Sequence, residues 1–273
     1  MSSQRPSAVD LTVSSEVLSV SDDDERCLLA QAVKFTEIEK SLRELRLGRM
    51  IVIADDEDRE NEGDLMIAAE MVTPEVINFM ATYARGLICL AMTGERLDQL
   101  QLGPMVLHNT ANLGTAFTVS IDARGRGVKT GISSYDRAQT ILAGVDPRTR
   151  PEDLARPGHV FPLRSRPDGV LERRGQTEAS VDLARLAGLH QAAVICEIMN
   201  RDGSMARGSD LRRFCSEYSL AMVTVAQLVR YRLETESAKP PGPHPPWTYE
   251  RAGWGELWEE DAMHINSHTG DRR

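Results

Sequence analysis

Residues 50–64 read MIVIADDEDRENEGD, an apolar run followed at once by a dense group of acids. The apolar part, Met50 to Ala54, has the length and the β-branched content of a short buried strand. Seven carboxylates then lie between Asp55 and Asp64, so we expect them at a strand end rather than along a solvated helix. Crowded carboxylates raise one another's pKa unless a cation neutralises them, and such hard oxygen ligands suit Mg²⁺ or Mn²⁺.

A charged surface loop is the usual meaning of such a run and is the alternative interpretation. Three residues embedded among the acids argue against it, because they add donors and flexibility. Arg59 supplies a forked donor, Asn61 an amide and Gly63 a flexible backbone. We therefore interpret residues 55–64 as the metal-binding and substrate-binding corner of an active site.

Outward from this segment, helical and strand patterns alternate along the chain. Thr36 and Glu39 predict a capping box at the start of a helix that ends at Gly48. This alternation predicts an α+β fold whose helices and strands are interleaved, as they are in α/β proteins. We expect it to form one domain over residues 35–236. We expect further helices near 74–83, 135–143, 178–187 and 210–218, and strands at 50–54, 87–92, 116–122, 192–198 and 220–225.

The two ends of the chain differ in composition from this domain. Residues 1–34 are rich in Ser, Asp and Glu and predict a mobile arm. The segment KPPGPHPPW at 239–247 excludes regular structure and opens a tail over 237–273. Trp247, Trp254 and Trp258 lie in this tail, which either docks on the body or a partner or remains disordered.

Composition limits the class of partner. The chain has 273 residues, with 41 acids against 32 bases and a net charge of −9, which disfavours nucleic acid. No apolar run approaches the roughly 20 residues that span a bilayer, so no membrane partner is expected. The four cysteines form no closely spaced pair, as in a reduced cytoplasmic protein.

A second cluster, Arg173-Arg174-Gly175-Gln176-Thr177, precedes a helix expected to begin near Glu178. A helix N-terminus with adjacent arginines and a hydroxyl suits a phosphate monoester. The alternative is that Thr177 acts only as a helix N-cap.

Three single residues also stand out. His159 follows Pro157 and Gly158 in an expected turn, where a lone histidine is more often incidental than catalytic. Glu197 is an acid inside the apolar strand AAVICEIM and needs a partner or a function. Cys89, in GLICLAM, is a core residue first and a thiol of interest second.

Taken in order, these segments resemble one enzyme family, 3,4-dihydroxy-2-butanone 4-phosphate synthase, over about residues 36–235. The matching segments are DDEDRENEGDL (55–65), GLICLAM (86–92), NT (109–110), GTAFTVSIDA (114–123), TGISSYDRA (130–138), RPGHVFPLR (156–164), RRGQTEASVDLARLAG (173–188) and ICEIMNRDGSMAR (195–207).

The resemblance implies a homodimeric lyase of riboflavin biosynthesis that converts D-ribulose 5-phosphate into 3,4-dihydroxy-2-butanone 4-phosphate and formate with Mg²⁺ or Mn²⁺. Enolisation at C3 would need a base, and loss of the C1 hydroxyl would need an acid. Expulsion of C4 would need a carbonyl polarised by the metal. By resemblance, the catalytic residues are His159, Glu197, Glu62, Asp55 and Cys89; the substrate-binding residues are Arg59, Asp64, Arg173, Thr177 and Thr130; the metal ligands are Glu60 and Gln176.

Gln176 departs from the family pattern, which has a metal-ligating histidine at this position. A glutamine oxygen can bind a hard cation but is a poorer ligand than imidazole for most divalent metals. Two alternatives to a working synthase therefore stay open: a divergent phosphosugar lyase of a specialised pathway, and a catalytically impaired sugar-phosphate-binding relative. We expect no second catalytic domain, although many relatives are fused to a GTP cyclohydrolase.

Overall fold

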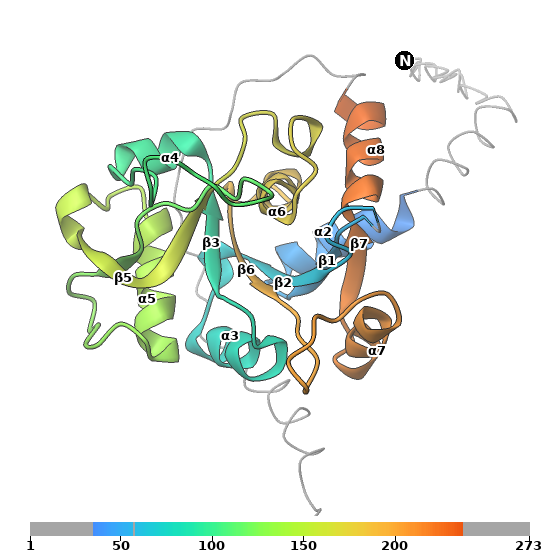
Figure 1. The fold of residues 1–273 in the computed structure, drawn as a ribbon, viewed down its shortest axis with the longest axis horizontal. Coiled ribbons are helices and arrows are strands. Elements are labelled where there is room, and N and C mark those ends of the chain that lie inside the picture. Colours follow the sequence, from blue (N-terminus) through green and yellow to red (C-terminus); the bar gives the residue numbers. More distant parts are fainter. Residues whose placement is uncertain (1–34, 57, 237–273) are drawn as a thin grey trace, which may run out of the picture. The chain divides into compact units, whose positions relative to one another are not determined.

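The computed structural model describes residues 35–236 except Glu57 (Figure 1). The predicted arm at 1–34 and the Pro-rich tail with its three tryptophans lie outside the described residues. Cys27 lies outside them as well. None of the described helices is long and apolar enough to cross a membrane.

A seven-stranded mixed sheet forms the centre of the fold, in the order β4-β5-β3-β6-β2-β1-β7 (Figure 1). The pairs β1–β7 and β3–β5 are parallel and the other neighbours are antiparallel. This mixture of directions confirms the predicted α+β class. The strands are β1 (Ile51–Ala54), β2 (Gly63–Ala68), β3 (Cys89–Met92), β4 (Ile121–Ala123), β5 (Leu154–Arg164), β6 (Ala192–Glu197) and β7 (Ala221–Thr224).

Helices cover both faces of the sheet, because both faces are apolar. Alternate residues of β1 belong to different buried clusters: Val52 packs on one face, and Ile51 and Ile53 on the other. The second face is covered by α2 (Thr36–Arg46), α6 (Gln176–Leu186) and α8 (Val225–Glu236). The first is covered by α3 (Pro74–Phe79), α4 (Gly94–Gln99), α5 (Ser134–Val145) and α7 (Ser209–Glu217). A π-helical turn, η2 (Met80–Ala84), follows α3, and three 3-10 turns lie at η1 (Ala69–Met71), η3 (Pro151–Asp153) and η4 (Gly169–Leu171).

Several expected elements were wrong or incomplete. His159 does not lie in a turn but in β5. This strand pairs in parallel with β3 from Phe161 onward. The strand expected at 116–122 is reduced to β4 at 121–123. The α2 helix begins at Thr36 with Phe35 as N-cap, so the capping box is wrong. The strands β2 and β5 and the helices α4 and α8 were not predicted.

Candidate active site

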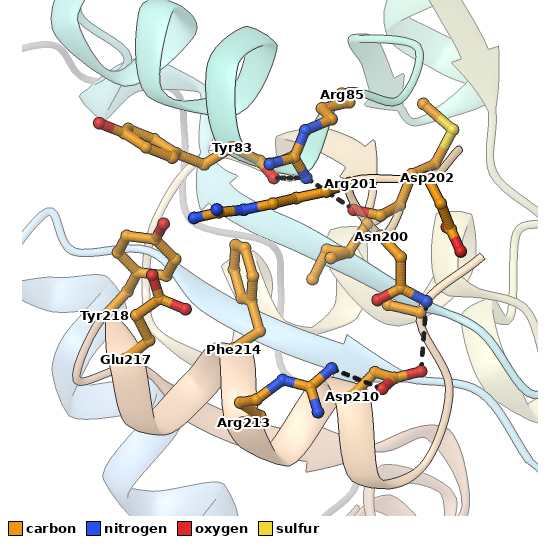
Figure 2. A pocket seen from close by; sticks show the side chains of 13 residues that line it. Tyr83, Arg85, Asn200, Arg201, Asp202, Asp210, Arg213, Phe214, Glu217 and Tyr218 are labelled. Atoms are coloured by element: carbon orange, nitrogen blue, oxygen red, sulfur yellow. Dashed lines mark hydrogen bonds and ion pairs between the residues drawn. The ribbon is translucent and has the colours of Figure 1, made fainter. Parts of the chain in front are cut away.

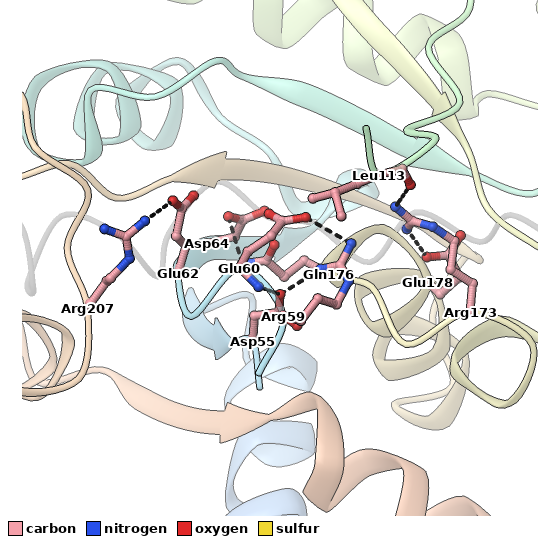
Figure 3. Close-up of polar contacts among 10 residues, drawn as sticks. All are labelled: Asp55, Arg59, Glu60, Glu62, Asp64, Leu113, Arg173, Gln176, Glu178 and Arg207. Carbon is pink, nitrogen blue, oxygen red and sulfur yellow. Dashed lines mark hydrogen bonds and ion pairs between the residues drawn. The ribbon is translucent and has the colours of Figure 1, made fainter. Parts of the chain in front are cut away.

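The acidic segment forms the loop of the β1–β2 hairpin (Figure 3). The Asp55 backbone N–H donates to the Glu62 carbonyl at 2.8 Å, which closes the loop. Arg59 donates to Asp55 at 2.6 Å and pairs with Glu60 at 2.8 Å. Arg207, from the segment after β6, pairs with Glu62 at 2.7 Å. The expected acidic corner is therefore a folded loop held by two arginines.

Asp64 extends this cluster into the sheet. It is the first acid of β2, and its partner across the strand pair is Glu197 of β6. Burial raises the pKa of Asp64 well above its usual range, and Glu197 and three further carboxylates add to the rise. The Gln176 amide donates to Asp64 at 3.1 Å from the first turn of α6. Five acidic side chains therefore crowd one edge of the site: Asp55, Glu60, Glu62, Asp64 and Glu197.

Glu197 is held closely by the backbone of the segment before β3. Its carboxylate accepts a hydrogen bond from the Leu87 N–H at 2.8 Å. A side chain at Gly86 would lie 2.3 Å from the Glu197 carbonyl oxygen, so only glycine allows this approach. Glu197 is the last residue of β6 and is half-buried, rather than fully buried inside the strand as expected.

A cavity of about 470 Å³ lies beside residues 198–202, which follow β6, and between η2 and α7 (Figure 2). Arg85 reaches across its rim and donates to the carbonyls of Tyr83 and Met199, both at 2.7 Å. The rings of Tyr218 and Phe214 pack together, with their centroids 4.8 Å apart. None of the predicted site residues lines this cavity. Arg85 thereby joins the end of η2 to the backbone that follows β6.

The predicted phosphate cluster forms the N-terminus of α6. The helix begins at Gln176, two residues earlier than expected, with Gly175 as N-cap. Thr177 therefore lies in the first helical turn, and the N-cap alternative is wrong. The Arg173 guanidinium donates to Glu178 at 2.7 Å and to the Leu113 carbonyl at 3.1 Å (Figure 3). The Glu178 side chain is 2% exposed, so a buried carboxylate holds Arg173 in place.

His159 and Thr130 make no direct contact with this cluster, but His159 lies level with Glu197 at the same edge of the sheet, since Cys89 pairs with both Phe161 and Ile195. Glu197 and His159 lie on strands β6 and β5, with β3 between them, so their backbones are about 10 Å apart across the sheet. His159 instead contacts Asp122 of β4, and Thr130 precedes the glycine that packs on this pair. Among the described residues, no hydrogen bond or ion pair joins His159 or Thr130 to the acidic loop.

Cys89 lies in β3 on the same sheet face as Glu197 and is 3% exposed. Burial raises the pKa of its thiol, and the nearby Glu197 and Asp64 carboxylates raise it further. A thiol kept protonated in this way is a poor nucleophile. We expect iodoacetamide at pH 8 to leave Cys89 unmodified in the folded protein and to modify it in urea, as peptide mapping by mass spectrometry would show. Fast alkylation of native Cys89 would contradict this assignment.

Three residues of the site were not identified from the sequence. Asp122 is an acid among the apolar residues VSIDA, the same signal that singled out Glu197. Glu178 resembles an ordinary acid of a first helical turn, so its contact with Arg173 gave no signal. Arg207 lies 145 residues from Glu62, and no local pattern predicts that pair.

The donor atoms near the acidic loop suit a divalent cation. Among residues 35–56 and 58–236, no three His, Cys, Asp or Glu side chains converge as a complete metal site. Magnesium is nevertheless commonly bound by one or two carboxylates, with water and substrate oxygens as the other ligands. Burial raises the pKa of Glu60, and the buried Asp55 Oδ1 has no hydrogen-bond partner in the described part of the chain. Both observations indicate negative charge that a cation would neutralise.

Comparisons with known proteins agree with this arrangement. The family model for 3,4-dihydroxy-2-butanone 4-phosphate synthase matches residues 39–231. A riboflavin biosynthesis protein RibBA of Aquifex aeolicus is 58% identical over 205 residues, which are 75% of this chain and 50% of that protein. A 3,4-dihydroxy-2-butanone 4-phosphate synthase of Neisseria meningitidis is 54% identical over 73% of this chain and 55% of that protein.

A solved structure is also similar. It is a 3,4-dihydroxy-2-butanone 4-phosphate synthase in complex with two magnesium ions, with a TM-score of 0.70 and 41% identity, and the match covers 73% of this chain and 97% of that chain. The chain spans about half the length of the two curated relatives described above. The family model covers most of the described residues and contains every predicted site residue. The chain belongs to the 3,4-dihydroxy-2-butanone 4-phosphate synthase family.

Proposed function

We propose that this protein is a lyase that converts D-ribulose 5-phosphate into 3,4-dihydroxy-2-butanone 4-phosphate and formate for riboflavin biosynthesis. The observation that carries the proposal is the hairpin loop with Arg59, Glu60 and Glu62, set against the N-terminus of α6. One side of this site presents carboxylates that can exchange protons. The other presents Arg173 and free helix N–H groups that can bind a phosphate.

In this proposal the phosphate is bound by Arg173, Thr177 and the first turn of α6. Glu178 neutralises part of the charge of Arg173 but also fixes its direction, since it holds one guanidinium nitrogen at 2.7 Å. The substrate is thereby held by the end that does not react, which helps to orient its reacting carbons. Arg59 and Asp64 then contact the sugar hydroxyls.

Proton transfer is assigned to the carboxylates and the imidazole. The pKa of Asp64 is raised by burial, so this group can hold a proton at a pH where an ordinary aspartate cannot. Glu197 and His159 act as general acid–base groups, and Asp55 and Glu62 shape the loop. Cys89 lies on the same face of the sheet as Glu197 and is kept as a neutral thiol by its burial.

The proposal includes one or more divalent cations, Mg²⁺ or Mn²⁺, held by the Glu60 carboxylate and the Gln176 side-chain oxygen. When bound, such a cation supplies Lewis-acid stabilisation of negative charge on substrate oxygens. Gln176 fits this role because its Nε2 donates to Asp64, which leaves the amide oxygen for a hard cation.

We also propose a homodimer. Met105, Val106 and Leu107 are exposed in the segment between α4 and β4, and Leu107 is 95% exposed. Neighbouring exposed apolar side chains are often covered by a partner. Leu113 of the same segment accepts a hydrogen bond from Arg173, so covering it would also shield the phosphate end of the site. The proposal also includes a cytoplasmic location and no nucleic-acid or membrane partner. It divides the chain into an arm over residues 1–34, a synthase domain over 35–236 and a tail over 237–273.

The assay is formate release from ribulose 5-phosphate with Mg²⁺ or Mn²⁺, using the full chain and its Gln176→His variant. We expect formate from both proteins. The histidine variant should reach half-maximal rate at a lower Mn²⁺ concentration, because imidazole is the better ligand for that metal. Formate from the variant alone would identify an impaired relative, and a different product would identify a divergent phosphosugar lyase. No product from either protein would exclude the proposed reaction.

A further inference from the structure

His159 and Asp122 form a closely held pair at the junction of β5 and β4. The His159 Nδ1 atom lies 2.8 Å from Asp122 Oδ2. The His159 backbone N–H also donates to Asp122 Oδ1, at 2.9 Å. Asp122 therefore contacts the same residue through both carboxylate oxygens, once at the main chain and once at the ring. This double contact fixes both the position and the rotation of the imidazole.

Gly131 closes over the pair. Its φ is +90°, and an added Cβ would lie 2.3 Å from Asp122 Oδ2 and 2.4 Å from His159 Nδ1. The Gly131 N–H donates to the buried Asp136 carboxylate at 2.9 Å, which holds the loop in this place. Only a residue without a side chain can pack on the pair in this conformation. The loop, the strand pair and the two side chains thus form one assembled unit.

We propose that Asp122 is a positioning residue that sets the tautomer of His159. A carboxylate can only accept hydrogen bonds, so His159 must carry its proton on Nδ1 to satisfy the 2.8 Å contact. Nε2 then keeps a free lone pair and can take a proton from substrate. The His159 side chain is 44% exposed, and no described residue forms a hydrogen bond with Nε2. This inference rests on the proposed function for the step that His159 performs.

The Asp122→Asn substitution tests the inference sharply. The backbone N–H of His159 is a fixed donor, so the new amide must turn its oxygen toward it. The amide NH₂ then faces Nδ1, which has to become an acceptor. The proton moves to Nε2, and the ring can no longer act as a base through that atom. Imposing the wrong tautomer in a comparable acid–histidine pair costs on the order of 10⁴ in kcat.

We expect Asp122→Asn to lower kcat by at least about 100-fold with KM little changed. Nitrogen-15 NMR of the histidine rings should show Nδ1–H for His159 in the wild-type protein and Nε2–H in the variant. A His159→Gln variant assigns the signals. The matched control is Asp98→Asn, which removes an exposed carboxylate that pairs with Arg164 and should leave the tautomer and the rate unchanged. A merely structural role for Asp122 would not move the ring proton.

A second variant, Gly131→Ala, probes the same pair without changing either member. Its Cβ would displace the carboxylate or the ring, so kcat should fall while Asp122 and His159 are both present. An unchanged tautomer in Asp122→Asn, or a changed tautomer with a wild-type rate, would overturn the inference. If the wild-type protein releases no formate, that failure belongs to the proposed reaction, and the NMR result still decides whether Asp122 sets the ring.

Discussion

Glu197→Gln is expected to lower kcat for formate release by about 10³-fold while the folded structure is kept, because loss of a positioned acid–base group costs 10²- to 10⁴-fold. Glutamine has nearly the same shape, and its oxygen can still accept the Leu87 N–H that Glu197 binds at 2.8 Å. What is lost is a carboxylate able to exchange a proton at the end of β6.

The stability of the Glu197→Gln variant separates chemistry from folding. In the wild-type protein, Glu197 is the charged group that contributes most to the raised pKa of Asp64, after burial itself. Removing this repulsion favours the folded state and offsets the weaker, uncharged acceptor of the Leu87 N–H, so we expect Tm to be unchanged or higher. Glu152→Gln is the matched control, because the Glu152 side chain is 68% exposed and lies outside the site. Wild-type kcat in Glu197→Gln would remove Glu197 from the chemistry.

The acidic corner could be predicted because its signal is local. An apolar run that turns at once into seven acids places those acids at a strand end, and β1 with its hairpin loop confirms this. The acid inside AAVICEIM was identified in the same way, since an ionised group in an apolar strand needs a reason. The structure places Glu197 directly opposite Asp64, which a strand pattern alone cannot predict because register depends on the whole sheet.

The rest of the site depends on contacts between distant segments. β5 contains Pro157, Gly158 and Pro162, which by propensity indicate a turn, yet β3 and β4 pair with it from its two sides. Propensity was overruled by tertiary pairing, and His159 moved from a turn into a strand. Its partner Asp122 lies 37 residues earlier, so neither residue alone indicated the pair.

Arg232→Met is expected to destabilise the protein by about 3–5 kcal/mol, because it removes one partner of a buried ion pair. Arg232 of α8 donates to Asp182 of α6 at 2.7 Å and to the Asp168 carbonyl at 2.8 Å. The side chains of the pair are 9% and 7% exposed. Asp182 also accepts the Val170 N–H at 2.9 Å, so one carboxylate joins α8, α6 and η4. Urea unfolding at fixed protein concentration measures the loss.

The pH dependence of this variant follows from the same carboxylate. Burial already raises the pKa of Asp182, and Arg232 is one of the groups that lowers it, so Arg232→Met should raise it further. An acid whose pKa is higher in the folded than in the unfolded protein binds its proton more tightly when folded. Proton binding by this acid therefore stabilises the folded protein at low pH, and this stabilisation is lost as the pH rises. The loss caused by Arg232→Met should therefore be smaller at pH 4 than at pH 8.

Two further variants show whether the buried charge is the cause. Arg232→Met combined with Asp182→Asn removes both charges while the new amide oxygen can still accept the Val170 N–H, so the double variant should be more stable than Arg232→Met alone, because no buried charge is left without its partner. Arg213→Met makes the same substitution in the exposed Arg213–Asp210 pair, whose side chains are 69% and 30% exposed, and should cost less than about 1 kcal/mol. If the double variant is no more stable than Arg232→Met alone, the arginine stabilises α8 through packing and its contact with the Asp168 carbonyl rather than through its charge.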